Sequence, residues 1–175
     1  LGQYERAIGD FDEAIRLDSK YAEAYYNRGL LYRYLGQYER AIVGYDQAVR
    51  PDPQYIEAYN NRGIAYGYLG QHERANGDYN VAIWLDSLHA NAYYNRGIAY
   101  GYLGQHERAI GDYNEAIRLD PQHAKAHYNR GLPYGSLGQH VRDISHFDGD
   151  LGIPPTHTQA YHNRGRPYRH PAPPQ

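Results

Sequence analysis

The chain contains no cysteine and no methionine, only one tryptophan and two phenylalanines, and almost no excess of charge of either sign. Without cysteine it can form neither a disulfide framework, nor a thiolate nucleophile, nor a cysteine-ligated zinc site. Its 18 basic and 20 acidic residues leave a formal net charge of −2, whereas nucleic-acid-binding domains usually carry a basic stripe. We therefore expect no nucleic-acid partner.

Long hydrophobic runs are also missing. No apolar stretch is long enough to span a bilayer and no signal-peptide pattern opens the chain, so we expect no membrane partner. The absence of cysteine fits a reducing compartment, from which we expect a cytoplasmic location. Because the chain begins at Leu1 and lacks methionine, we expect it to be part of a longer protein.

A repeat of 34 residues runs through the whole chain. The tripeptide Leu-Gly-Gln begins at Leu1, Leu35, Leu69, Leu103 and Leu137, and Asn-Arg-Gly begins at Asn27, Asn61, Asn95, Asn129 and Asn163. A fixed period of this length is typical of one supersecondary unit that is copied and stacked. Stacked units form a long surface rather than a deep cleft. We therefore expect a binding protein and not an enzyme, with no catalytic residue, no cofactor and no metal site.

Each repeat contains two helical stretches. In residues 22–55, the first stretch ends near Gly36, because glycine readily takes the left-handed conformation that closes a helix. The second stretch ends before Pro53, because the residue preceding a proline avoids helical backbone angles. The pattern therefore predicts a helix, a tight turn, a second helix and a short loop.

Helical phase gives the first helix of the repeat two different faces. Tyr25, Gly29 and Tyr32 share one face, and Asn27 and Tyr34 lie on the opposite one. In the second helix, small alanines and a large tyrosine lie along one face. This alternation of large and small residues is what the packing of antiparallel helices requires.

The pattern resembles the tetratricopeptide repeat, a helix–turn–helix family with aromatic residues, glycine, two alanines and a closing proline at fixed positions. In the second copy the matching residues are Tyr25, Gly29, Tyr32, Gly36, Tyr38, Ala41, Tyr45, Ala48 and Pro53. The next copies match at Tyr59, Gly63, Tyr66, Ala75, Tyr79 and Ala82, and at Tyr93, Gly97, Tyr100, Ala109, Tyr113, Ala116 and Pro121. The resemblance implies an all-α fold, a right-handed superhelical solenoid of antiparallel helix hairpins whose first helices line a concave groove.

The repeat divides the chain into complete and incomplete copies. We assign 1–21 to the second helix of a truncated repeat, 22–55, 56–89 and 90–123 to full repeats, 124–157 to a degenerate repeat, 158–170 to a partial first helix, and 171–175 to a proline-rich tail. Asp143 and Asp150 replace two packing alanines, and Pro133 and Pro167 fall inside first helices. An interior proline costs a helix about 3 kcal/mol. We therefore expect a well-formed solenoid to about Gln122 and a frayed end beyond it.

An arginine stands in every copy where the family usually has leucine, just before the glycine of the first helix. These residues are Arg28, Arg62, Arg96, Arg130 and Arg164. Antiparallel geometry brings them near acidic residues of second helices, so we expect ion pairs with residues such as Asp10, Asp78 and Asp112. If hydrophobic packing can replace the pair, we expect Arg96→Leu to be tolerated.

The resemblance places one asparagine of each copy on the concave side. This asparagine ladder consists of Asn27, Asn61, Asn95, Asn129 and Asn163. An amide side chain offers both a donor and an acceptor, the pair needed to hold an extended peptide backbone. A second interpretation stays open, in which the asparagines cap or brace their own helices.

Tyrosines and charged residues accompany the asparagine ladder. The predicted groove tyrosines are Tyr26, Tyr94, Tyr128, Tyr34, Tyr68 and Tyr102, which either supply contact area to a ligand or pack repeats together. Glu23, Glu57 and Lys125 stand four residues before their asparagines and either orient a peptide or are ordinary surface residues.

Two further site types fit the sequence poorly. Some family members hold acidic chaperone tails with a clamp of basic residues, but here Leu30, Ile64 and Ile98 stand at clamp positions and only Lys125 is basic, so we expect no tight binding of such tails. The recurring histidines form two sets at opposite edges of the solenoid, too far apart to share a metal ion.

We therefore expect a non-catalytic scaffold for protein–protein interaction that binds an extended peptide or a partner helix in its groove. Two alternatives stay open. The chain is the targeting arm of a larger enzyme, such as a glycosyltransferase or kinase, or it is a structural solenoid that forms homo-oligomers through its exposed ends.

Overall fold

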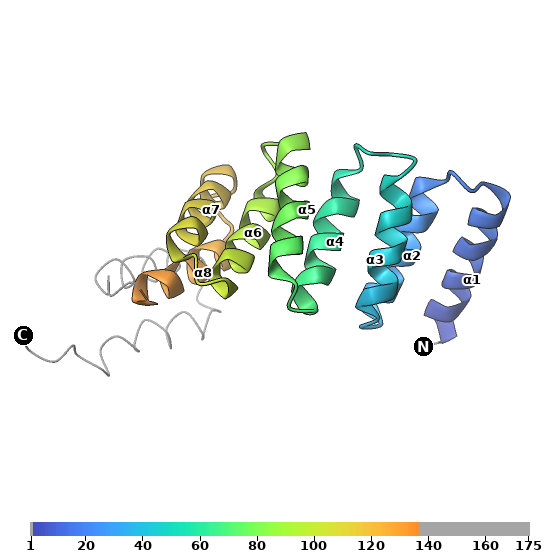
Figure 1. The fold of residues 1–175 in the computed structure, drawn as a ribbon, viewed down its shortest axis with the longest axis horizontal. Helices are drawn as coiled ribbons and strands as arrows, with labels where there is room; N and C mark the ends of the chain where they lie inside the picture. The colour runs from blue at the N-terminus through green and yellow to red at the C-terminus, as the bar shows by residue number, and fades with distance from the viewer. Residues whose placement is uncertain (1, 137–175) are drawn as a thin grey trace, which may run out of the picture. The chain divides into compact units, whose positions relative to one another are not determined.

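The computed structural model describes residues 2–136, and these residues confirm the expected all-α fold (Figure 1). The helices are α1 (Gly2–Leu17), α2 (Ala22–Tyr34), α3 (Tyr38–Val49), α4 (Ile56–Tyr68), α5 (His72–Leu85), α6 (Ala90–Tyr102), α7 (His106–Leu119) and α8 (Ala124–Ser136). The part of the chain described here contains no strand. None of its helices has the length and apolar character needed to cross a bilayer.

The helices form two compact units, one from Leu1 to Ser87 and one from Leu88 onward. In the first unit, α2 packs on α3 and α4 packs on α5 as hairpins, with α1 against α2 and α3 against α4. In the second unit, α6 and α7 form the hairpin and α8 packs on α7. The predictions for 137–157, 158–170 and 171–175, including Asp143, Asp150, Asn163, Arg164 and Pro167, lie outside the described residues.

Each turn inside a hairpin is closed by the predicted glycine. Gly36, Gly70 and Gly104 have φ of +72°, +71° and +70°, the left-handed region that glycine tolerates best. At the first turn the backbone N–H of Gln37 donates to the carbonyl of Tyr32 at 2.8 Å and satisfies a group that the helix end leaves unpaired. The Leu-Gly-Gln tripeptide therefore marks the end of the first helix of each hairpin.

Replacing Gly70 with alanine is expected to lower the unfolding free energy by about 1–2 kcal/mol, because a Cβ is disfavoured in the left-handed conformation. Nothing lies within 4 Å of a Cβ built there, so the cost comes from backbone strain and not from a clash. Urea titration followed by circular dichroism measures the change. Gly70→Asn is the control, since asparagine tolerates this conformation and should lose less. Equal losses for the two variants would contradict the explanation.

The core is built from alanines and tyrosines that meet glycines. Ala41, Ala48 and Tyr45 of α3 are completely buried. A Cβ added to Gly29 of α2 would lie 2.9 Å from the ring of Tyr45, so the ring packs directly on the glycine backbone. This arrangement confirms the predicted pairing of large and small residues across a hairpin. Burial raises the pKa of the Tyr45 hydroxyl above its ordinary range, so this side chain stays protonated.

The arginines tie neighbouring helices together. Arg62 of α4 donates through Nε and Nη2 to Asp78 of α5, at 2.8 and 2.5 Å, and through Nη1 to Asp46 of α3 at 2.5 Å. Burial alone would lower the pKa of Arg62, but the two carboxylates together raise it. The expected pair of Arg96 with Asp112 is also present, with two bonds of 2.7 Å.

One predicted pair is wrong. Arg28 does not pair with Asp10 but donates to Asp12 of α1 at 2.5 Å and to Gln47 of α3 at 2.8 Å. Asp12 holds the same repeat position as Asp46, the second partner of Arg62, so this contact repeats with the period. Within its own hairpin Arg28 finds Gly44 where Asp78 stands in the next copy, and there it donates to Gln47 instead.

The expected fraying after Gln122 is also wrong for the part of the degenerate repeat described here. Helix α8 runs from Ala124 to Ser136 with Pro133 inside it. Ala126 and Gly131 are buried, and the helix packs on α7. We attribute its persistence to this packing, which offsets the hydrogen bond that proline cannot donate.

Candidate functional site

The predicted groove residues lie on the first helices of the hairpins, and two of the asparagines bond to the preceding first helix. In the first unit, Asn61 Nδ2 donates to the Tyr26 hydroxyl at 3.1 Å and to the carbonyl of Glu57 at 2.9 Å. In the second unit, Asn129 Nδ2 donates to the Tyr94 hydroxyl at 3.0 Å. Asn27 and Asn95 are half-buried on α2 and α6.

These two asparagine–tyrosine pairs leave at least one acceptor and one donor each. Within residues 2–136, the Oδ1 atoms of Asn61 and Asn129 accept no hydrogen bond, and the hydroxyls of Tyr26 and Tyr94 donate none. Both N–H groups of the Asn61 amide are occupied, so the donor role that we expected of this asparagine passes to the phenol, whereas Asn129 keeps one N–H group of its own. Each pair therefore presents a C=O and an O–H side by side.

The rings of Tyr26 and Tyr94 pack between hairpins. The Tyr26 ring centroid lies 4.8 Å from that of Tyr55, and the Tyr94 centroid lies 4.7 Å from that of His123. Burial raises the pKa of both tyrosine hydroxyls, so both stay protonated as donors. These contacts favour the interpretation in which the two rings pack repeats together, while their hydroxyls remain able to donate hydrogen bonds to a ligand. Tyr128 is half-buried on α8.

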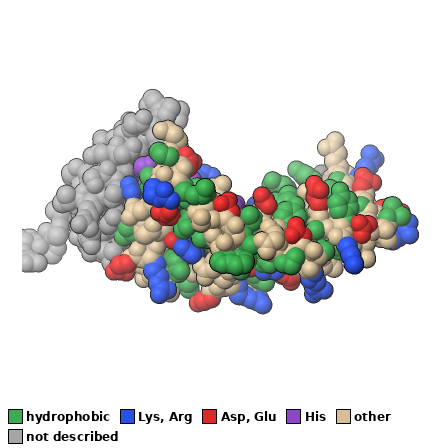
Figure 2. All heavy atoms as spheres, turned by 90° about the horizontal axis from the view of Figure 1, so that it is seen from above, with side chains coloured by type: hydrophobic (Ala, Val, Ile, Leu, Met, Phe, Trp, Pro, Cys, Tyr) green, Lys and Arg blue, Asp and Glu red, His purple; other side chains and the backbone are tan. Residues whose placement is uncertain are grey.

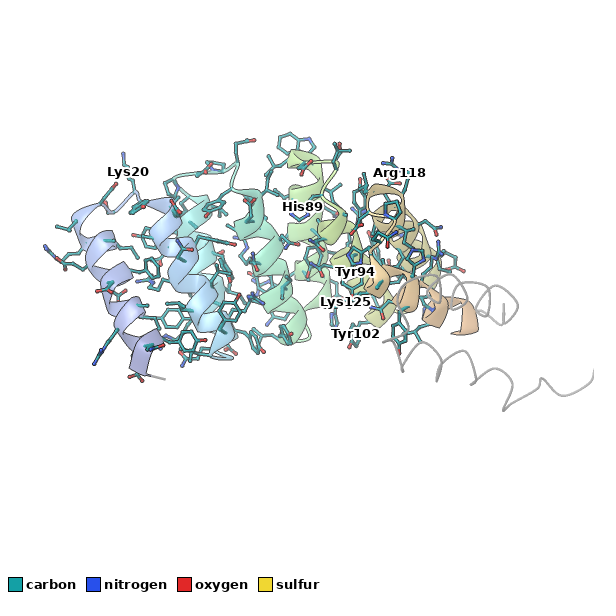
Figure 3. All side chains as sticks on the ribbon, turned by 180° about the vertical axis from the view of Figure 1, so that it is seen from behind. Lys20, His89, Tyr94, Tyr102, Arg118 and Lys125 are labelled. Atoms are coloured by element: carbon teal, nitrogen blue, oxygen red, sulfur yellow. The ribbon has the colours of Figure 1, made fainter. Side chains whose placement is uncertain are left out.

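A second set of tyrosines is exposed at the turn ends of the first helices. Tyr34 and Tyr68 are each 65% exposed and Tyr102 is 73% exposed. Tyr68 also stacks on Tyr38 of α3, with centroids 4.6 Å apart and ring planes 5° from parallel. Figure 3 shows Tyr94 and Tyr102 along α6, with Tyr102 near the turn. The exposed surfaces of these rings offer contact area to a ligand.

The charged residues predicted for the groove are exposed. Glu23 and Glu57 lie on the first turns of α2 and α4 in the first unit, and Lys125 lies on the first turn of α8 in the second. On the face seen in Figure 2, acidic and basic side chains are interspersed among apolar ones. Exposed charges of this kind contribute little binding energy individually.

A hollow of about 450 Å³ opens between α6, α7 and α8 of the second unit. It brings together two predicted site residues, Tyr102 and Asn129, which come from different helices. The remaining lining residues are Ile98, Gly101, His106, Tyr113, Leu132 and Pro133. Sequence reasoning missed the hollow, although its signal was present as departures from the repeat. Gly101 and His106 stand where Arg33 and Tyr38 stand in the first complete copy.

Two of the histidines cap helices. His89 Nδ1 and His123 Nδ1 each accept the backbone N–H of the residue three positions later, at 3.2 Å, and so cap α6 and α8. Among residues 2–136 no cluster of histidine and acidic side chains has the arrangement of a metal site. We assign no metal chemistry to this part of the chain.

Comparison with known proteins identifies a family and its solved structures. A family model described as "Tetratricopeptide repeat" matches residues 90–123, and one described as "TPR repeat" matches residues 1–33 and 29–70, together more than half of the chain. A comparison with curated proteins gave no match.

Three solved structures illustrate the likeness. MamA from Desulfovibrio magneticus RS-1 is 25% identical, with a TM-score of 0.83 over 90% of this chain and 89% of that one. YrrB, described as a TPR protein with an unusual peptide-binding site, is 27% identical, with a TM-score of 0.80 over 92% and 83%. The first TPR of Spaghetti (RPAP3), bound to the HSP90 peptide SRMEEVD, is 30% identical, with a TM-score of 0.67 over 69% and 96%.

Proposed function

Because the chain belongs to the tetratricopeptide repeat family, we propose that it is a non-catalytic scaffold that holds an extended peptide segment of a partner protein. The segment lies along the exposed faces of two successive first helices within one unit, either α2 and α4 of the first unit or α6 and α8 of the second. Peptides are the ligands named for two similar proteins, YrrB and the first TPR of RPAP3, which supports this ligand class.

The observation that carries the proposal is the pair of Asn61 with Tyr26, repeated as Asn129 with Tyr94. An extended peptide offers N–H and C=O groups that need an acceptor and a donor. The amide oxygen and the phenol hydrogen supply them, and the bond between the two side chains fixes both before the ligand arrives. Fixing a site in advance lowers the entropy cost of binding.

The ligand is expected to differ from an acidic chaperone tail. Leu30, Ile64 and Ile98 are apolar and half-buried, so they offer no charge at the positions where related proteins hold a terminal carboxylate. Lys125 is the one basic residue in a clamp-like position. The proposal therefore rests on backbone recognition with aromatic contact, and not on ion pairing.

Capture of peptides from a random array tests the proposal. We expect Asn61→Ala and Tyr26→Phe each to weaken capture about 5-fold, since each change removes roughly 1 kcal/mol of hydrogen bonding. Trp84→Ala is the matched control. Trp84 is 78% exposed on α5, the second helix of its hairpin, so its replacement removes exposed aromatic surface at a site other than the asparagine–tyrosine pairs. Capture that is equal for wild type and both pair variants would remove the proposed role of the pairs.

A further inference from the structure

We propose that the hollow between α6, α7 and α8 is an anchor pocket for an aromatic side chain of the bound peptide. This inference rests on the proposed function, since it names the residue type that the partner segment must carry. The pocket is defined by Ile98, Gly101, Tyr102, His106, Asn129 and Leu132.

The first unit provides the internal reference for what fills this space. There, Tyr38 begins α3, and its ring carries the stacked ring of Tyr68 at 4.6 Å. Two repeats later, His106 stands at the position of Tyr38. The smaller, flat imidazole keeps a stacking surface there.

A second departure from the first complete copy widens the pocket. Arg33 of α2 is replaced by Gly101 in α6, which removes a long side chain from the wall. A Cβ added to Gly101 would meet nothing within 4 Å, so the space in front of this glycine is open. Compared with Arg33 of α2 and Tyr38 of α3, the wall of the pocket therefore has smaller residues at two positions, Gly101 and His106.

The lining matches an aromatic ring that carries a polar tip. Ile98, Tyr113 and Leu132 offer apolar and aromatic contact, and Leu132 is 44% exposed. Asn129 also lines the pocket, and its Oδ1 accepts no hydrogen bond within residues 2–136. This oxygen can accept a hydrogen bond from a phenol O–H or an indole N–H. Tyrosine and tryptophan are therefore expected to bind more tightly than phenylalanine, and phenylalanine more tightly than leucine.

The position of Asn129 connects the pocket to the proposed peptide path. Asn129 lines the pocket and also belongs to the pair with Tyr94. A peptide residue whose backbone N–H bonds to Asn129 Oδ1 would have a neighbouring side chain next to the opening. The partner is accordingly an extended segment with an aromatic residue at one fixed position.

The test uses fluorescent peptides acetyl-Ser-Gly-Asn-X-Asn-Gly-Ser-amide with X as tyrosine, phenylalanine, leucine or alanine, and measures binding by anisotropy. We expect the tyrosine peptide to bind at least about 10-fold more tightly than the alanine peptide, from ring burial and stacking together. Gly101→Arg should remove this difference, because it restores the side chain found at Arg33.

Gly67→Arg is the matched control, because Gly67 holds the same repeat position in α4 and a Cβ there also meets nothing within 4 Å. This variant should keep the preference for tyrosine. If all four peptides bind equally and still lose affinity in Asn61→Ala, the proposed function stands and the aromatic pocket is overturned.

A second measurement keeps the pocket testable if every peptide binds too weakly. p-Cresol, the side chain of tyrosine, should shift the NMR signals of the His106 ring in the intact chain and not in Gly101→Arg. A shift without any peptide binding would support the pocket and reject the proposed function. Absence of the shift, or a Gly101→Arg variant with a markedly lower melting temperature, would overturn the pocket. The second result would mean that the chain or a second copy fills the pocket itself.

Discussion

Replacing Arg62 with leucine is expected to lower the unfolding free energy of the protein by about 3 kcal/mol, because it leaves the buried Asp78 carboxylate without its partner. The side chain of Asp78 is 8% exposed and receives two hydrogen bonds from Arg62. Asp46, the other partner, is 41% exposed and can return to water. Urea titration followed by circular dichroism measures the loss.

Two further variants distinguish the effect of breaking the buried ion pair from the effect of removing an arginine. Arg28→Leu should cost less than about 1 kcal/mol, because its carboxylate partner Asp12 has a side chain that is 52% exposed. Arg62→Leu combined with Asp78→Leu should recover most of the stability, since apolar residues of similar size often replace a buried pair without loss. If Arg62→Leu proves as mild as Arg28→Leu, the buried pair does not stabilise the first unit.

The same reasoning changes the expectation for Arg96. Sequence alone leads us to expect that Arg96→Leu is tolerated. In the structure Asp112 is 7% exposed and holds two hydrogen bonds from Arg96. Leucine alone would leave this carboxylate buried and unpaired. Tolerance is therefore expected only when Asp112 is replaced as well.

The second large effect concerns a glycine that looks replaceable from helix propensity. Gly63→Ala is expected to destabilise the protein by about 1–3 kcal/mol, because the new methyl group overpacks a buried contact. Its Cβ would lie 2.6 Å from the ring of Tyr79, which is 3% exposed. Calorimetric melting measures the change.

Gly77→Ala is the matched control in the same unit. Gly77 lies inside α5 and a Cβ there meets nothing within 4 Å, so this change should stabilise the helix by about 0.5–1 kcal/mol. The two glycine variants should therefore shift the melting temperature in opposite directions. A rise in melting temperature for Gly63→Ala would show that the Tyr79 ring can move aside at little cost.

The repeat period predicts the local structure well, because each copy carries the same stop and packing signals. The left-handed turn at Gly36 and the burial of Tyr45 both follow from local residue types. The period cannot predict the Gln47 partner of Arg28, because that contact depends on the missing carboxylate at Gly44. Nor does local propensity predict that α8 continues through Pro133, since packing on α7 outweighs it.

The candidate site is less accessible to sequence reasoning. Helical phase places Asn61 on a face, but it says nothing of the Tyr26 hydroxyl that occupies its amide nitrogen. The pocket is harder still, because it arises from departures in α6, α7 and α8 that matter only together. Comparing each copy with the others, position by position, is the signal that could have found it.

Arg62 bonds to carboxylates of two successive hairpins, and this arrangement affects how the number of repeats can change during evolution. Its guanidinium contacts Asp78 within its own hairpin and Asp46 in the hairpin before it. Tandem duplication of one whole copy brings an arginine together with at least one carboxylate, such as Asp46, Asp78 or Asp112, so the new arginine keeps a partner. An insertion or deletion of a few residues would instead separate the arginine from its carboxylate and leave a buried charge without a partner. Selection is thereby directed toward growth and shrinkage in whole copies.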